Sequence, residues 1–248
     1  MSERKDLRFL LLQARRPGDR VRGEEQQAFA GRLGVELDQV QGVDIFHDEL
    51  DVEYAREFSA VLVGGAGEYG VLDGHPRVDA MIKHLVALSE IGHPVFASCF
   101  GFQALVVGLG GAVITDEAAA EVGTYVLTAE PRVDDDPVFS ILPPEFNAQL
   151  GHKDRASVLP SCAHNFASSA LCPYQAIRIS GTPVYATQFH PELTWSDNRT
   201  RFERYMPQYG RLFGAEEAQR KLDSHKPSPE SNQLLSRFVD CVLLGADQ

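Results

Sequence analysis

The most informative chemical feature of the sequence is a cysteine at the junction between a predicted strand and a predicted helix. Residues 94–98 form a short apolar run typical of a buried strand, Cys99 follows, and a helix is predicted from Phe100. Such a turn exposes a nucleophile at the carboxyl edge of a sheet, and the N-terminus of the helix favours the thiolate. A structural cysteine is the alternative at this point, because free cysteines are often simply buried.

A histidine and a glutamate two residues apart supply the partners that a thiol nucleophile needs. Side chains two positions apart on an extended segment point the same way, so His190 and Glu192 are expected to share a face, and Pro191 restrains them. The base takes the proton of the nucleophile, and a carboxylate fixes the tautomer of the base. Taken alone, the triplet is better explained as a strand-end histidine with an incidental glutamate, but together with Cys99 it indicates a catalytic set.

A glycine-rich loop follows another predicted strand, residues 59–63. Gly64 and Gly65 stand at its carboxyl end, where backbone N–H groups can stabilise a developing oxyanion. Gly65, Gly67 and Gly70 also have the spacing of a dinucleotide-binding loop, but the next helix is predicted only from residue 77, which argues against that use. The sequence has no Gly-x-x-x-x-Gly-Lys-[Ser/Thr] phosphate loop either, so no cofactor is expected.

The order of the predicted elements indicates an α/β fold. Apolar runs alternate with amphipathic runs of helical spacing through about residue 110, as in parallel strands joined by helical crossovers. The strands predicted there are 8–13, 59–63 and 94–98, and the helices are 24–33, 77–91 and 100–109. The second half predicts strands at 124–128, 146–150, 176–179 and 184–189, joined by short loops that favour antiparallel pairing beside the parallel sheet.

The length of the chain predicts its domain organisation. A chain of 248 residues fits one α/β domain with an appendage. We expect a domain over residues 1–206 and a C-terminal helical extension, residues 207–248, packed on it. A helix is predicted from residue 199, the polar stretch 223–229 is the best candidate for a linker, and 232–244 is predicted to form a closing amphipathic helix.

Charge and cysteine content narrow the class of protein. The formal net charge is −12, so neither nucleic acid nor an anionic membrane is an expected partner. The longest apolar stretch, 105–114, is far shorter than a membrane span, and no signal peptide is predicted, so a cytoplasmic protein is expected. Four cysteines without a Cys-x-x-Cys pair indicate reduced thiols, and neither a disulfide framework nor a metal site is expected.

Three motifs together resemble those of the class I (triad-type) glutamine amidotransferases, in particular the stand-alone, GMP-synthase-like branch. They are Cys99-x-Gly101-x-Gln103, the Gly64-Gly65 loop and the segment 188–192, which contains His190 and Glu192. The resemblance covers roughly residues 8–206. It implies a flavodoxin-like fold, in which a mostly parallel central sheet is flanked by helices.

The resemblance also implies a catalytic role for each of three side chains. Cys99 would attack the γ-amide of glutamine, and His190, held by Glu192, would shuttle protons. A γ-glutamyl thioester would form and then be hydrolysed. One departure from the family pattern is Ala97, which stands where the family usually has glycine.

The resemblance also implies that further residues take part in substrate binding. The backbone N–H groups of Gly65 and Phe100 would form the oxyanion hole. Gly64 and Gln103 would line the glutamine pocket, and His152 is a weaker candidate for its border.

Three functions remain open on these grounds. The first is a free-standing hydrolase of glutamine or other γ-glutamyl compounds, which is slightly preferred because no ATP-binding signature is present and the tail after Tyr205 is short. The second is a glutaminase subunit that delivers ammonia to a separate synthetase. The third is a non-catalytic binding protein that kept the fold, against which the complete set of Cys99, His190 and Glu192 argues.

Overall fold

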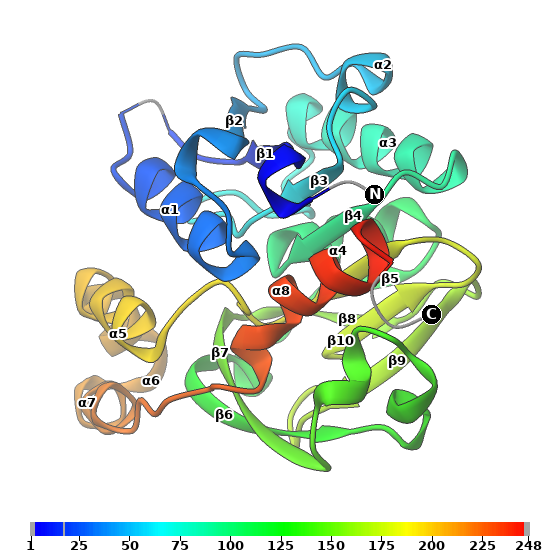
Figure 1. Ribbon diagram of the computed structural model, residues 1–248. Coiled ribbons are helices and arrows are strands. Elements are labelled where there is room, and N and C mark those ends of the chain that lie inside the picture. Colours follow the sequence, from blue (N-terminus) through cyan, green and yellow to red (C-terminus); the bar gives the residue numbers. More distant parts are fainter. Residues whose placement is uncertain (1–2, 17, 246–248) are drawn as a thin grey trace.

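A mixed β-sheet forms the centre of the computed structural model, which describes residues 3–16 and 18–245 (Figure 1). Within those residues the sheet has nine strands. In spatial order they are β2 (Val40–Asp44), β1 (Phe9–Gln13), β3 (Ala60–Val63), β4 (Val95–Ser98), β11 (Val184–Thr187), β10 (Ala176–Ile179), β9 (Ala163–Ser168), β6 (Glu121–Ala129) and β7 (Glu145–His152). Outside this sheet, β5 (Ala112–Thr115) and β8 (Asp154–Val158) pair with each other.

The two halves of the large sheet differ in strand direction. The strands from β2 to β11 pair in parallel, and those from β11 to β7 pair antiparallel. The predicted α/β class, with a parallel first half and antiparallel strands in the second, is therefore confirmed. The prediction grouped β11 with the antiparallel strands, whereas this strand also pairs in parallel with β4 and so joins the two halves.

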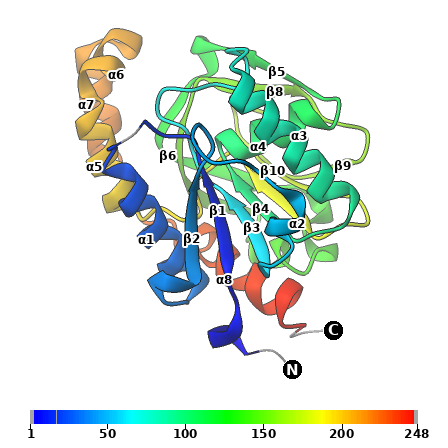
Figure 2. The same cartoon turned by 90° about the horizontal axis from the view of Figure 1, so that it is seen from above.

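Helices cover both faces of the parallel half. α1 (Val21–Leu33) and α8 (Leu234–Phe238) lie on one face, and α3 (Pro76–Glu90) and α4 (Phe100–Gly108) lie on the other (Figures 1 and 2). Beside β6, a separate layer consists of α5 (Trp195–Arg204), α6 (Met206–Phe213) and α7 (Ala215–Asp223). The other helical segments are α2 (Val52–Ala55), a π turn at Val239–Leu243, and 3-10 turns at Arg4–Asp6, Leu37–Gln39, Glu117–Ala119, Pro131–Asp135, Phe139–Ile141 and Ser231–Gln233. Among the described residues, no helix combines the length and the apolar character that crossing a bilayer requires.

The inner parallel strands β1, β3, β4 and β11 are buried along their whole length because both of their faces are covered. In β1, Leu10 and Leu12 belong to the cluster beneath α3 and α4, whereas Phe9 and Leu11 belong to the cluster beneath α1 and α8. This assignment follows the two-residue period of a strand. It also fixes the register, since a slip by one residue would exchange the two sets.

Four short strands escape prediction from the sequence, namely β2, β5, β8 and β9. β2 lies at the edge of the sheet, and Gln41 and Gly42 at its centre are exposed. β9 carries the polar residues His164 and Asn165. Polar residues within a strand interrupt the apolar pattern from which strands are predicted.

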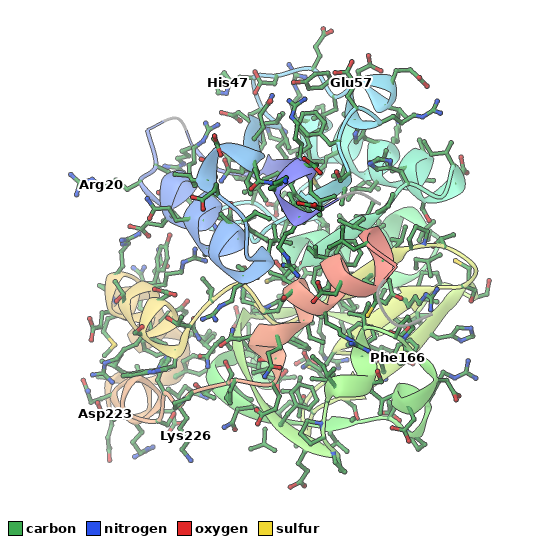
Figure 3. The ribbon with its side chains drawn as sticks, viewed as in Figure 1. Arg20, His47, Glu57, Phe166, Asp223 and Lys226 are labelled. Carbon is green, nitrogen blue, oxygen red and sulfur yellow. The ribbon has the colours of Figure 1, made fainter. Side chains whose placement is uncertain are left out.

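The polar stretch after α7 is bound along the sheet. The N–H group of Lys226 donates to Thr124 Oγ1 at 2.9 Å, and Gln149 Nε2 donates to the Lys226 carbonyl at 2.9 Å. Asp223, at the end of α7, lies at the same corner of the molecule as Lys226 (Figure 3). These contacts lead the chain from α7 along β6 and β7 to α8.

α8 is packed into the core rather than onto its surface. The Phe238 side chain is fully buried. Its ring lies edge-on to Phe96 of β4, with 5.5 Å between centroids, and to Tyr185 of β11, with 5.8 Å. α8 therefore packs directly against the two central strands, on the face of the sheet that α1 also covers.

Replacing Phe238 by alanine should lower the free energy of unfolding by about 3–5 kcal/mol, because the removal of a buried aromatic side chain leaves a cavity. Denaturant-induced unfolding measures this loss. Leu171→Ala is the matched control, since Leu171 is 43% exposed and its truncation should cost no more than about 0.5 kcal/mol. Equally small losses in both variants would contradict a core role for α8.

Candidate functional site

Cys99 stands in a strained turn between β4 and α4. Its backbone has φ 51° and ψ −99°, and it is the one described residue other than glycine with a positive φ. Its N–H group donates to the Thr187 carbonyl of β11 at 2.7 Å, and its carbonyl accepts from the N–H group of Gln103 at 3.1 Å. Backbone strain of this kind persists only where the surroundings impose it, and it is frequent at functional sites. The predicted strand–cysteine–helix junction is therefore present.

The turn at Cys99 requires a glycine two residues later. A Cβ atom on Gly101 would lie 2.7 Å from Val63 Cβ and 2.9 Å from Ala97 Cβ, so any side chain there would push α4 away from β3 and β4. Ala97, the departure from the family pattern, is fully buried. Its methyl group is thus accommodated, and it closes part of the space in front of Gly101.

His190 and Glu192 follow β11 and form a buried pair. His190 Nδ1 lies 2.7 Å from Glu192 Oε1, and the two residues are only 6% and 1% exposed. The N–H group of His190 donates to the Gln149 carbonyl of β7 at 2.8 Å, which fixes the backbone. The Cys99 side chain lies close enough to the imidazole to contribute to its raised pKa, and both residues line one cavity. The structure therefore brings together the three side chains that the sequence places in two distant motifs.

The electrostatics of the pair favour an imidazolium beside the sulfur. Burial alone would lower the pKa of His190, but the Glu192 carboxylate and Cys99 outweigh it and raise this pKa to about 10. Burial would raise the pKa of Glu192, but His190 and then Arg201 hold that pKa below its ordinary value. The pair accordingly carries both of its charges at neutral pH.

The Gly64-Gly65 loop lies directly against this pair. A Cβ atom on Gly65 would lie 2.8 Å from His190 Cε1, and one on Gly64 would collide with the Glu25 carboxylate. Glu25 is itself fixed by Arg15 Nη2 at 3.0 Å. Gly65 is therefore required for the backbone to approach the imidazole, and Gly64 is required for it to approach the Glu25 carboxylate.

Gln103 takes a different place from the one expected of a residue that lines the substrate pocket. Its Nε2 donates to the Asp154 carbonyl at 2.7 Å and to Gln188 Oε1 at 3.3 Å. The amide that reaches the nucleophile is that of Gln188, whose Nε2 lies 3.8 Å from Cys99 Sγ. Gln188 belongs to the motif quoted above, but its role depends on how β11 lies beside β4, which the sequence does not reveal.

Cys99, His190 and Gly65 open onto a cavity of about 470 Å³. α5 and α6 form its roof, and its lining there includes Arg201, Tyr205, Gln208, Tyr209 and Leu212. Burial, assisted by Tyr205 and Cys99, raises the pKa of Tyr209 to about 12, so its phenol stays protonated. His152 lies in the opposite wall, whereas Gln103 is not among the described residues that line the cavity.

The charged lining of the cavity is mostly positive. Arg15, Lys153, Arg201 and Arg211 line it together with a single described carboxylate, Glu117. The whole chain carries a net charge of −12, so this is a local reversal of sign. Such a cavity attracts an anionic group.

Two residues beside the cavity wall have no counterpart in the sequence prediction. Glu121 and Cys172 lie next to His152, and the potential metal-binding atoms of these three residues lie within 4.8 Å of one another. The residues are 31 and 20 positions apart in the chain. Because that spacing matches no known metal motif, only the tertiary structure reveals the cluster.

Comparison with known proteins assigns most of the chain to one family. The sequence profile described as glutamine amidotransferase class-I matches residues 31–205, which contain Cys99, His190 and Glu192. The glutamine-hydrolysing GMP synthase of Thermosipho africanus is 38% identical over 105 residues, 42% of this chain and 20% of that protein. One subunit of the glutamine-hydrolysing GMP synthase of Methanothermobacter thermautotrophicus is 29% identical over 123 residues, 50% of this chain and 64% of that protein. Both matches span less than two thirds of the relative's length.

Solved structures share the fold over almost the whole chain. The crystal structure of a glutamine amidotransferase from Thermotoga maritima has a TM-score of 0.69 at 18% identity, and the match covers 94% of this chain and 96% of that one. At this identity the likeness concerns the fold alone. The family profile, however, matches well over half of the sequence, and the chain therefore belongs to the class I glutamine amidotransferase family.

Proposed function

We propose that this chain hydrolyses a γ-glutamyl amide, with glutamine as the first candidate substrate, through a thioester on Cys99. The observation that carries the proposal is a single cavity lined by both a thiol on a strained turn and an imidazole that is held 2.7 Å from a buried carboxylate. The cavity is large enough for an amino acid. A binding protein would need neither the strain nor the buried ion pair.

The first step forms the thioester. Cys99 attacks the γ-carbonyl carbon as a thiolate paired with the His190 imidazolium. The imidazolium then gives its proton to the departing nitrogen, so ammonia or an amine leaves as the C–N bond breaks. The N–H groups of Gly65 and Phe100 would stabilise the oxyanion. The position of Gly65 against His190 supports the role of the Gly65 N–H group. Phe100 lies at the first turn of α4, where N–H groups have no partner within the helix, and this supports the role of the Phe100 N–H group.

The second step releases glutamate. The now neutral His190 takes a proton from water, and the resulting hydroxide attacks the thioester carbon. The C–S bond breaks, and Cys99 and His190 return to their starting state. In both steps, the hydrogen bond between Glu192 and His190 Nδ1 holds the imidazole in the orientation that proton transfer needs.

The positive lining of the cavity suits the α-carboxylate of the substrate. Arg15 is 5% exposed and is held by Glu25, so its guanidinium is fixed in place. Arg201 approaches from the roof on α5. A carboxylate bound between these two cations would place the far end of a γ-glutamyl group at Cys99, and this supports an amino-acid amide as substrate.

A second candidate function is a glutaminase subunit that serves a separate, ammonia-accepting synthetase. The observation that favours it is the similarity to a protein whose name makes it one subunit of a glutamine-hydrolysing GMP synthase. The chemistry at Cys99 is the same in both functions. They differ in whether the purified chain is active alone.

The purified chain should release glutamate from glutamine or from γ-glutamyl dipeptides, and enzymatic measurement of glutamate tests this. Asparagine, which is one methylene shorter, is the matched control substrate, and Cys99→Ala is the enzyme blank. Rapid release by the chain alone supports the free-standing hydrolase. Slow release that an ammonia-accepting synthetase accelerates supports the second function, and no release under either condition contradicts both.

Variants of the three central residues should differ in severity. Cys99→Ala and His190→Asn should each lower kcat by at least roughly 10⁴-fold, whereas Glu192→Gln should retain about 10–100 times more activity, since an orienting carboxylate contributes less than the nucleophile and base. Steady-state kinetics on folded protein measures this. Wild-type turnover in Cys99→Ala would refute the mechanism, and Cys162→Ala, at a partly exposed cysteine, is the matched control.

The raised pKa of His190 predicts how the protonation of its imidazole, and the stability that the ion pair contributes, change with pH. The folded pKa of about 10 exceeds the ordinary 6.5, so the pair's stabilisation is complete below about pH 6.5 and is lost as the pH rises towards 10. Glu192→Gln removes the largest interaction that raises this pKa while the lowering effect of burial remains. NMR titration of the imidazole Cε1–H, assigned through His190→Asn, should therefore move to lower pH in Glu192→Gln, and more than in Cys99→Ala. An unchanged titration would contradict the ion pair.

A further inference from the structure

A buried cluster of three potential metal ligands lies beside the cavity. Glu121 begins β6, His152 ends β7, and Cys172 follows β9. The residues are 0%, 6% and 1% exposed, and one oxygen, nitrogen or sulfur atom from each lies within 4.8 Å of the others. His152 also lines the cavity onto which Cys99 opens, whereas Glu121 and Cys172 are not among the described residues that line it.

Several polar atoms in this cluster lack hydrogen bonds. No described residue offers a hydrogen bond to Glu121 Oε1 or to either ring nitrogen of His152. His152 Nε2 and Glu121 Oε2 are 3.2 Å apart, within ion-pair distance, but they are not aligned as a hydrogen bond. Buried polar atoms normally have a partner, so a group without one requires an explanation.

The contacts that do exist hold the potential ligands in place. Gln175 Nε2 donates to Glu121 Oε2 at 2.6 Å, and this leaves the other carboxylate oxygen free to bind elsewhere. The backbone N–H of Cys172 donates to Ser169 Oγ at 2.9 Å. Gln175 thus orients the carboxylate, as outer residues do around metal centres, and the Cys172 thiol donates to the Ala119 carbonyl at 3.7 Å.

We propose that Glu121, His152 and Cys172 bind a divalent transition-metal ion, with Zn²⁺ as the preferred ion. A thiolate, an imidazole and a carboxylate are the donor types that Zn²⁺ takes, and three protein ligands leave a fourth position for water or a further group. Gln175 lies next to these ligands. Its Oε1 has no hydrogen-bond partner among the described residues and is therefore free to interact with the ion.

Metal binding would change the state of the cysteine. Burial and then Glu121 raise the pKa of Cys172, so without metal it is a neutral thiol and a poor nucleophile. As the metal–sulfur bond forms, the S–H bond breaks and the proton passes to solvent. The ion would join β6, β7 and the segment after β9, and it would fix the wall of the cavity that His152 lines.

Cobalt substitution tests the site with a readout independent of activity. The experiment uses the Cys99→Ala chain, so that the nucleophile cannot supply a thiolate, freed of metal with a chelator and titrated with Co²⁺. We expect one ion per chain and a thiolate-to-cobalt charge-transfer band. Adding Cys172→Ser should abolish the band and weaken Co²⁺ binding by more than about 100-fold. That loss is larger than the loss expected when a residue that only hydrogen-bonds to a ligand is replaced. Adding Cys162→Ser instead is the matched control and should leave both unchanged.

Thermal unfolding provides the second measurement. Zn²⁺ should raise the Tm of the Cys99→Ala chain but not that of the chain that also carries Cys172→Ser, because only a ligand bound to the folded state stabilises it. Circular dichroism verifies that each variant is folded, and Glu121→Gln replaces Cys172→Ser if that variant is not. A band that survives the loss of Cys172, or no metal binding by the Cys99→Ala chain, would overturn the proposal.

Discussion

The parallel pairing of β4 with β11 is the constraint on which the site depends. Thr187 stands opposite Ser98 in this ladder, and the Thr187 carbonyl accepts the N–H of Cys99 at 2.7 Å. The strand that ends in the cysteine and the strand that leads to His190 therefore finish at the same edge of the sheet. A slip of one residue would move one group by about 3.3 Å and turn its strand over, which would separate sulfur from imidazole.

Two clusters in this chain contain the same three residue types with different hydrogen bonding around the histidine. His190 has both a hydrogen-bonded carboxylate and a sulfur beside it, and its proton is accounted for. His152 faces Glu121 with neither ring nitrogen in a hydrogen bond to a described residue. Residue type alone thus does not determine whether such a cluster takes part in acid–base catalysis or binds a metal ion. The hydrogen bonds around the histidine distinguish the two clusters.

The sequence predicts those parts of the structure that depend on neighbours in the chain. The turn at Cys99 and the pairing of His190 with Glu192 involve residues next to or two positions from each other, and apolar runs covered on both faces mark the parallel strands. Gln188 and Cys172 escaped prediction because their partners lie far away in sequence, and only strand register brings them together. The edge strand β2 escaped because its exposed centre lacks an apolar pattern.

The burial of α8 has a consequence for the order in which the protein forms during synthesis. Phe238 packs on β4 and β11, and Asp240 forms an ion pair with Arg4 near the opposite end of the chain. The ion pair joins residues 236 positions apart, and such distant contacts form late because a long loop must close first. On the ribosome, the two strands that carry the reactive groups therefore remain without their support until α8 has emerged. A nascent chain of this protein has its nucleophile long before it has a finished site.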